Sequence, residues 1–396
     1  TSFTPRYLTE VTNASLAGGG AGAQLSGVLA VKSGDILRVW AGNGGVGSAS
    51  GAQPALGGEG YAAGGDSTGS SNATGSAQVV GTDSGYVYGA SGGGSSAVEL
   101  VRDGSVTVVA VAGAGGGGAQ LGTLTTHQSI FDAQPKDQLN PALRIAMEHR
   151  DANSTAGGSA GGDLGTDNTG QGGMLMASPY QEFKPLDEDD KTLDMRFMVT
   201  GGTAGRSGVA GTLGEAMIGI LDENNELKLM PMSTPWFESY DFPRYYLYGG
   251  DSVHEGEKGT GGANATGSYR GKGGSGALLS RTQGKLSLTS VASGGGAGYG
   301  GGGAGLNIWT VGSYYEAVFG RQVQFEGEGN IYSLSALSSG GGAGGSYINH
   351  EVVSDFALAT AQNANPTAGV RSPGSAALYS CTENATLNTP ITEGAL

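Results

Sequence analysis

Glycine tracts constrain the fold of this chain more than any other sequence feature. In the stretch 294–305, GGGAGYGGGGAG, nine of the twelve residues are glycine, and 79 of the 396 residues in the whole chain are glycine. Glycine loses more backbone freedom on folding than any other residue, so ordering such tracts is costly. An ordinary core of packed side chains therefore cannot be the whole architecture. Similar tracts lie at 18–22, 42–47, 64–65, 92–94, 113–118, 157–162, 201–214, 261–276 and 340–345.

The sequence between the tracts is strand-like. Apolar and β-branched runs in 23–45 predict a hairpin that turns at Ser33-Gly34-Asp35 and leads into a tract. The segment 95–118 repeats this plan, with Asp103-Gly104 as its turn. Looser versions follow at 285–305 and 330–348. This recurrence indicates that the folded chain brings its tracts side by side.

Tracts that lie side by side can form a core made of backbone. A glycine chain can adopt the extended left-handed polyproline-II geometry, with three residues per turn and no internal hydrogen bonds. Its N–H and C=O groups then point outward and must bond to neighbouring helices. In such a lattice every face is crowded, so almost every position must be glycine. The alternative is that the tracts are flexible spacers, and the sequence leaves it open.

Four segments together resemble a known domain. They are SGVLAVKSGDILRVWAGNGGVG, GGGSSAVELVRDGSVTVVAVAGAGGGG, GGGAGYGGGGAG and GGGAGGSYI. This combination resembles the glycine-rich domain in the ectodomains of the anaplastic lymphoma and leukocyte receptor tyrosine kinases, and similar domains occur in bacterial, algal and phage surface proteins. The resemblance covers 17–348 in discontinuous pieces. It implies a jelly-roll-like β-sandwich that carries a bundle of polyglycine-II helices.

We therefore expect an all-β fold, a jelly-roll-like β-sandwich with an inserted polyglycine-II bundle and a small mixed insert. No charged or proline-rich linker divides the chain into separate domains. The insert is expected to contain a short helix at 140–150 and a hairpin at 215–230. The expected division is an N-terminal strand or arm at 1–16, the glycine-rich sandwich and bundle at 17–120 and 249–348, the insert at 121–248, and an extended C-terminal tail at 349–396.

Composition disfavours a nucleic-acid partner and excludes a membrane-spanning helix and an intrachain disulfide. The net charge of −15 disfavours nucleic acid, because binding phosphates requires clustered lysine and arginine. No apolar run reaches the ~18 residues of a membrane-spanning helix. Cys381 is the only cysteine, so an intrachain disulfide is impossible.

The sequence predicts no catalytic, cofactor or metal site. No glycine-rich stretch ends in the Gly-Lys-Ser/Thr of a phosphate-binding loop. The acidic run Asp187, Glu188, Asp189 and Asp190 lacks the spacing of an EF-hand, so a solvated charged turn is expected. The histidines do not have the close spacing of a metal site; they are His127, His149, His254 and His350.

Aromatic residues crowd into the segment 235–248. One interpretation is a stacking platform for a glycan or a partner subunit, because tyrosine and tryptophan are enriched at interfaces. The other is that they form the core of the insert. The candidate partner-binding residues are Trp236, Phe237, Tyr240, Tyr245, Tyr246 and Tyr248.

Five Asn-X-Ser/Thr sequons are candidate glycosylation sites if the chain is secreted through a glycosylating pathway. All of them lie in polar, turn-like surroundings where a sugar would fit. They begin at Asn13, Asn72, Asn153, Asn264 and Asn384.

These observations predict a non-enzymatic structural protein, extracellular or exposed on a cell surface, whose copies assemble into a filament, hair or surface coat. The expected connectors are the N-terminal strand in 1–12 or the tail 350–396, lying along a neighbouring copy. The tail can instead fold back over its own sandwich. The alternative function is a phage or cell-surface adhesin that recognises a glycan or a surface protein. A receptor-type ectodomain and a polysaccharide-active enzyme are more distant alternatives.

Overall fold

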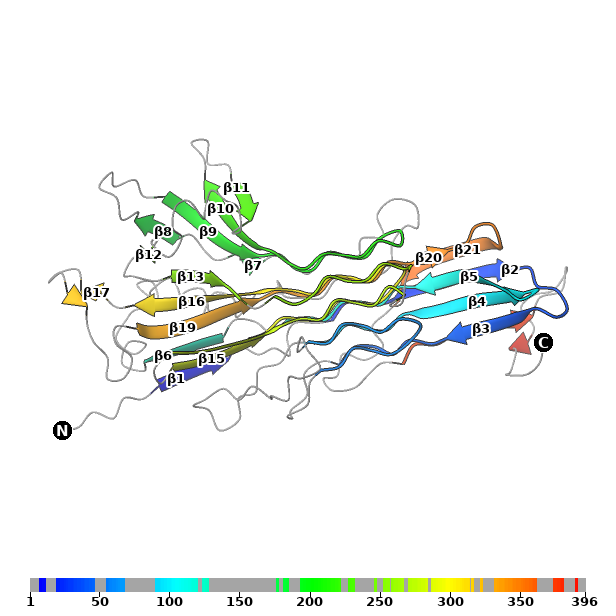
Figure 1. Cartoon of the computed structure of the whole chain (residues 1–396), viewed down its shortest axis with the longest axis horizontal. Coiled ribbons are helices and arrows are strands. Elements are labelled where there is room, and N and C mark those ends of the chain that lie inside the picture. Colours follow the sequence, from blue (N-terminus) through cyan, green and yellow to red (C-terminus); the bar gives the residue numbers. More distant parts are fainter. Residues whose placement is uncertain are drawn as a thin grey trace.

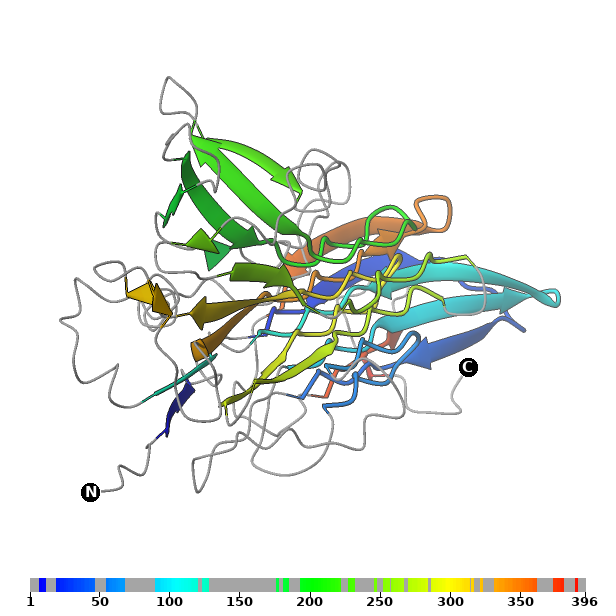
Figure 2. The same cartoon turned by 60° about the vertical axis from the view of Figure 1, so that its left-hand side comes forward.

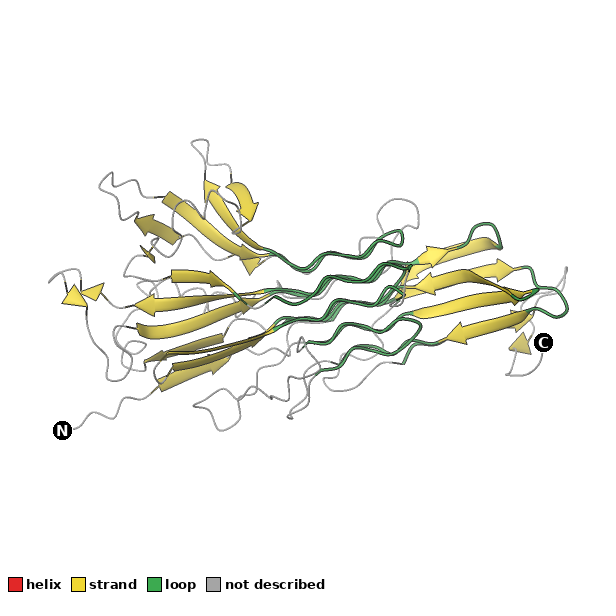
Figure 3. Ribbon diagram, in the orientation of Figure 1, coloured by secondary structure: helices red, strands yellow, loops and turns green. Residues whose placement is uncertain are grey.

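Strands gather at two ends of an elongated molecule, and the glycine tracts run between them (Figure 1). Every regular element in the part that the structure describes is a strand and none is a helix (Figure 3). The expected all-β class is thus confirmed. This computed structural model describes residues 7–11, 19–46, 55–67, 90–119, 123–127, 176–177, 181–184, 193–221, 227–231, 246–247, 252–256, 258–266, 270–283, 286–313, 315–316, 321–322, 331–361, 373–380 and 389–390.

The proximal end, which contains the first strand, is built from antiparallel sheets. One sheet has the order β1 (Tyr7–Val11), β6 (Thr123–His127), β19 (Ile331–Ser338), β16 (Asn307–Ser313) and β13 (Ser252–Glu255). A second has the order β11 (Leu227–Pro231), β10 (Ala216–Leu221), β9 (Leu193–Val199), β8 (Gln181–Lys184) and β12 (Tyr246–Leu247), and β7 (Met176–Ala177) also pairs with β9. Two short pairs are β14 (Leu278–Gln283) with β15 (Leu286–Val291), and β17 (Tyr315–Glu316) with β18 (Arg321–Gln322).

The distal end is a two-layer β-sandwich. One layer has the order β20 (Tyr347–Ile348), β5 (Ser105–Ala112), β4 (Ser96–Arg102) and β3 (Ile36–Trp40), and the other pairs β2 (Ala23–Leu29) with β21 (Val353–Thr360). Apolar side chains from both layers meet between them, and the buried ones are Leu100, Val109, Ile348 and Val353. The last described strands, β22 (Tyr379–Ser380) and β23 (Thr389–Pro390), pair with each other.

Two of the predicted hairpins are present. Strands β4 and β5 are joined by Asp103 and Gly104, with φ of 52° and 77°, so both turn residues have the positive φ of a type I′ turn. Strands β10 and β11 pair antiparallel up to Leu221 and Leu227, which confirms the hairpin expected at 215–230. The helix expected at 140–150 lies outside the described residues.

The hairpin predicted at 23–45 is wrong in its pairing. The two strands form, but β2 pairs with β21 and β3 pairs with β4, so the chain crosses from one layer of the sandwich to the other. The reason is burial: Leu25 and Leu29 of β2 and Leu37 of β3 pack against the same core from opposite layers. A hairpin would have placed these side chains in one sheet instead.

Parts of the expected insert and tail join the rest of the fold. Strand β6, from the range 121–248, pairs with β1 and β19, and the tracts 200–206 and 209–215 from this range lie among the other glycine tracts. Strand β21, from the tail 349–396, pairs with β2 of its own chain, so this part of the tail folds back over the sandwich.

Glycine tracts connect the two ends. They are extended and lie side by side along the long axis in both views (Figures 1 and 2). The stretch 294–305 forms two of them: the chain runs out, turns at 298–300 where Gly300 has a φ of 88°, and runs back. Its abundant glycine is thus explained by two adjacent tracts and the turn between them.

Candidate functional site

The candidate functional feature of this structure is a bundle of glycine tracts, the glycine bundle. We define it as the extended, non-strand segments between the two ends and name each segment by its residues. They are 19–22, 41–46, 55–60, 61–67, 90–95, 113–119, 200–206, 209–215, 258–266, 270–277, 292–298, 300–306 and 339–346.

Backbone N–H groups in tract 292–298 donate with a spacing of three residues. Gly294 donates to Ala90 at 3.1 Å, and Ala297 donates to Gly93 of the same neighbouring tract at 2.9 Å. The other donors follow the same rule: Gly295 to Gly274, Gly298 to Gly271, and Gly296 to Gly342. Successive residues therefore point toward three different neighbours in turn.

Carbonyl groups of tract 292–298 accept from three further tracts. The donors lie in 61–67, 113–119 and 300–306; they are Gly65, Ala114, Gly117, Gly302 and Gly305. The tract is thus bonded all around to other tracts. Few side chains take part, so the buried backbone groups of this tract bond mainly to the backbone of other tracts.

Close approach of the tracts explains why glycine is required inside the bundle. A Cβ added to Gly301 would lie closer than 3.0 Å to the carbonyl oxygen of Lys272, and one added to Gly116 would lie that close to Gly341. At the margin of the bundle the nearest atom to an added Cβ on Gly19 is 3.5 Å away, an ordinary contact. At these inner glycines there is thus no room for a side chain, whereas a side chain at Gly19 would fit.

Threonine side chains bond to the backbone where the bundle meets solvent. The hydroxyl of Thr203 accepts from the N–H of Thr212 at 2.7 Å, and that of Thr260 accepts from Ser275 at 2.9 Å. Both contacts are exposed. In the outer tracts, polar side chains thus form hydrogen bonds of the kind that neighbouring backbone forms inside the bundle.

Aromatic rings line the junction between the bundle and the distal sandwich. The ring of Tyr61 lies edge-on to Trp40 with centroids 5.2 Å apart, and the guanidinium carbon of Arg270 lies 5.1 Å from the Tyr61 centroid. Tyr299 and Tyr347 are stacked with centroids 4.2 Å apart. We call these five residues the aromatic step.

Two hydroxyl groups of the aromatic step, those of Tyr61 and Tyr347, have a raised pKa. Burial raises the pKa of Tyr61, and its hydrogen bond to the Glu99 carboxylate, 3.1 Å long, raises it further. Burial also raises the pKa of Tyr347. Tyr61 is thus a neutral donor to Glu99, a side chain that is almost fully buried.

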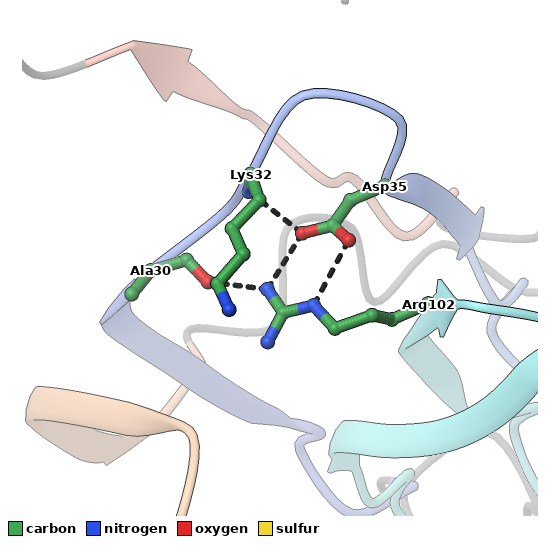
Figure 4. Close-up of polar contacts among 4 residues, drawn as sticks. All are labelled: Ala30, Lys32, Asp35 and Arg102. Atoms are coloured by element: carbon green, nitrogen blue, oxygen red, sulfur yellow. Dashed lines mark hydrogen bonds and ion pairs between the residues drawn. The ribbon is translucent and has the colours of Figure 1, made fainter.

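An ion pair fastens the distal tip (Figure 4). The Nε and Nη2 atoms of Arg102 donate to the two carboxylate oxygens of Asp35 at 2.9 and 2.6 Å, and Nη2 also donates to the carbonyl of Ala30. The Lys32 N–H donates to the same carboxylate at 2.7 Å. The Arg102 guanidinium and then the Lys32 amide lower the pKa of Asp35 to about 2. The pair ties the crossing between layers to the hairpin β4–β5.

Comparison with known proteins gives no relative. No protein-family model matches the sequence, and no curated protein or solved structure matches the chain.

Asn264 is the one candidate glycosylation residue within the described ranges. Its side chain is exposed, and its Oδ1 accepts from the N–H of Ala210 at 2.8 Å, which leaves the nitrogen Nδ2 for a sugar. The remaining sequons lie outside the described residues; they are Asn13, Asn72, Asn153 and Asn384.

Most of the aromatic segment 235–248 also lies outside the described residues. Tyr246 belongs to β12 and pairs with Lys184 of β8, with only its backbone described. The members outside the described ranges are Trp236, Phe237, Tyr240, Tyr245 and Tyr248.

None of the histidines within the described ranges lies in a metal site. His127 lies in β6, His254 lies in β13, and His350 packs its ring edge-on to Phe356 with centroids 4.6 Å apart. Outside these ranges lie His149, Cys381, Asp187, Glu188, Asp189 and Asp190. No group of three His, Cys, Asp or Glu side chains in the described part is arranged to hold a metal. None of its elements is a helix that could span a membrane.

Sequence analysis missed the aromatic step. A usable signal was present, since Tyr61, Tyr299 and Tyr347 each stand beside a glycine tract, in GGEGYAAGG, GGGAGYGGGG and GGAGGSYI. A bulky ring beside such a tract marks the point where the tract turns or becomes a strand, because the tract interior has no room for it.

Proposed function

We propose that this protein is a non-enzymatic, extracellular structural protein whose copies assemble into a filament, hair or surface coat. The observation that carries the proposal is the three-residue spacing of hydrogen-bond donors in tract 292–298. This spacing matches helices with three residues per turn, so we propose that the tracts are polyglycine-II helices. The same proposal includes a jelly-roll-like sandwich and kinship with the glycine-rich ectodomains named above.

Backbone hydrogen bonding makes the bundle a rigid rod. The bonds run across the long axis between neighbouring tracts and are distributed over the whole bundle. Each adds about 1 kcal/mol, and together they offset the entropy of ordering glycine. A rod of this kind holds its two β ends at a fixed separation, as a filament subunit requires.

Open sheet edges offer a route to assembly. In the described part of the chain, β1 has a partner on one side alone, at the edge of its proximal sheet, and β3 has the same position in the distal sheet. An edge strand can pair with a strand from another chain. Because the two edges lie at opposite ends of the molecule, head-to-tail pairing of copies would propagate into a filament.

Electron microscopy and light scattering test the assembly directly. The full chain is compared with a variant that lacks residues 1–11 and hence β1. We expect filaments or ordered polymers from the full chain and monomers from the variant. If the full chain stays monomeric over about a hundredfold rise in concentration, where mass action strongly favours association, self-assembly is refuted.

A second candidate function, an adhesin, is favoured by an exposed apolar row on the distal sandwich. Ile36, Val101 and Val106 are cross-strand neighbours on β3, β4 and β5, and Ile36 and Val106 are 59% and 52% exposed. Such a surface suits contact with a surface protein or the apolar face of a sugar. Binding of the chain to glycan arrays or to whole cells that is lost in Ile36→Asp would favour the adhesin.

A further inference from the structure

Two tyrosines far apart in the sequence face each other at the aromatic step. Tyr299 lies in the turn between tracts 292–298 and 300–306, and Tyr347 is the first residue of β20. Their ring centroids are 4.2 Å apart and the ring planes differ by 20°. Both side chains are half-buried. This arrangement places two phenols nearly face to face.

Backbone hydrogen bonds hold the pair in place. The N–H of Tyr299 donates to the carbonyl of Gly345 at 2.7 Å, and the N–H of Gly345 donates to Gly300 at 2.9 Å. Tyr347 pairs with Val111 in the distal sheet. The rings are therefore positioned by rigid elements on both sides, which is the condition under which proximity accelerates a reaction.

Gly208 leaves space beside the ring of Tyr299. Its φ is +82°, and a Cβ added there would lie 3.2 Å from the ring, closer than an ordinary contact. The Gly208 N–H also donates to the carbonyl of Tyr299 at 3.2 Å. The turn around 206–209 thus fixes the Tyr299 backbone while allowing its ring to lie against Tyr347.

We propose that Tyr299 and Tyr347 are a site of oxidative coupling, which joins their rings as dityrosine. A one-electron oxidant, such as a peroxidase fed by hydrogen peroxide, removes one electron and one proton from each phenol. The two phenoxyl radicals form a carbon–carbon bond between ring positions ortho to the oxygens. Each ring then moves its ortho hydrogen to oxygen and becomes a phenol again. Two electrons and two protons leave in total, and they reduce one peroxide to two waters.

The coupling would supply a covalent tie that this chain otherwise lacks. With Cys381 as its only cysteine, the chain cannot form an intrachain disulfide. The bond would join the turn of the central tracts to the distal sandwich, elements that hydrogen bonds and the ring contact hold together noncovalently. This role does not depend on self-assembly, so the site can be tested whether or not filaments form.

The experiment uses the folded full chain and a small photochemical oxidant, a ruthenium tris-bipyridyl complex with persulfate. We expect mass spectrometry to identify a peptide linked through Tyr299 and Tyr347. Its yield per chain should stay constant over about a tenfold dilution, because an intramolecular reaction has a fixed effective concentration. In guanidinium chloride the yield should fall to that of other tyrosine pairs, since unfolding separates the rings.

Matched variants separate this site from the other tyrosines. Tyr299→Phe and Tyr347→Phe keep a stacked ring but remove the phenol, so the linked peptide should disappear in both. Tyr61→Phe, in the same aromatic step, should retain it. If the linked peptide is absent from the folded wild type, or if its yield falls in proportion to dilution, the proposed site is wrong.

Discussion

Replacing Gly301 by alanine tests whether the bundle is a packed core. The new methyl would overlap the carbonyl oxygen of Lys272. The tract must shift to remove this overlap, and the shift strains two hydrogen bonds. Gly301 donates to Ala263 at 2.9 Å and accepts from Gly211 at 2.8 Å. A freely mobile spacer would not respond to this change.

The expected cost follows from three terms. Forced overpacking costs about 1–3 kcal/mol, and weakening two hydrogen bonds adds roughly 1 kcal/mol each. Alanine also lowers the conformational entropy of the unfolded chain, which stabilises the folded state by about 0.4–1 kcal/mol. The net loss of unfolding free energy for Gly301→Ala is therefore about 2–5 kcal/mol.

Two further variants provide the comparison. Gly116→Ala also places a methyl against a carbonyl, that of Gly341, so it should lose a similar amount. Gly19→Ala is the matched control: its methyl would lie 3.5 Å from the nearest atom, so it should be neutral or stabilising by up to about 1 kcal/mol.

Urea denaturation followed by tryptophan fluorescence measures these differences, and hydrogen exchange reports the tract amides. Gly301→Ala and Gly116→Ala should lower the denaturation midpoint and speed exchange in the bundle. If both unfold at the same urea concentration as Gly19→Ala, the tracts are not a close-packed lattice and the reasoning fails.

Three other changes test the tip, a turn and a sequon. Because folding lowers the pKa of Asp35 from its usual 3.8 to about 2, its contribution to stability is present above about pH 4 and is lost as pH falls toward 2. Melting temperatures of Asp35→Asn should therefore depend less on pH over this interval than those of the wild type, and equal slopes would contradict the ion pair. Gly104→Val, at a φ of 77°, should lower the melting temperature through roughly 1–2 kcal/mol of backbone strain, whereas Gly104→Asn should be nearly neutral. In chain secreted from eukaryotic cells, Asn264→Gln should lower the intact mass by one glycan, and an unchanged mass would show the residue unoccupied.

Local chemistry made part of the fold predictable from sequence. The Asp103-Gly104 turn was identified because only a few residue types accept positive φ at both turn positions. The strand-like segments before the glycine tracts were identified by their apolar, β-branched composition, as in β5 and β15. These signals act within a few residues of each other.

Long-range pairing was not predictable in the same way. A turn at Ser33-Gly34-Asp35 fits a hairpin and a crossing between layers equally well. What decides between them is β21, more than three hundred residues along the chain, which pairs with β2. Glycine has no side chain to specify a partner, so nothing in 292–298 indicates that its neighbours are 90–95 and 270–277. The glycan or subunit contacts proposed for 235–248 stay a prediction.

The three-residue spacing in the bundle has a consequence for how the protein can change length. Removing one or two residues from a tract such as 292–298 would turn its later donors toward the wrong neighbours and rotate the following strand. With the polyproline-II rise that we propose for the tracts, three residues added to every tract would preserve each donor's direction and lengthen the rod by about 9 Å. Evolution or design can therefore vary the separation of the two β ends in fixed steps, with both ends left unaltered.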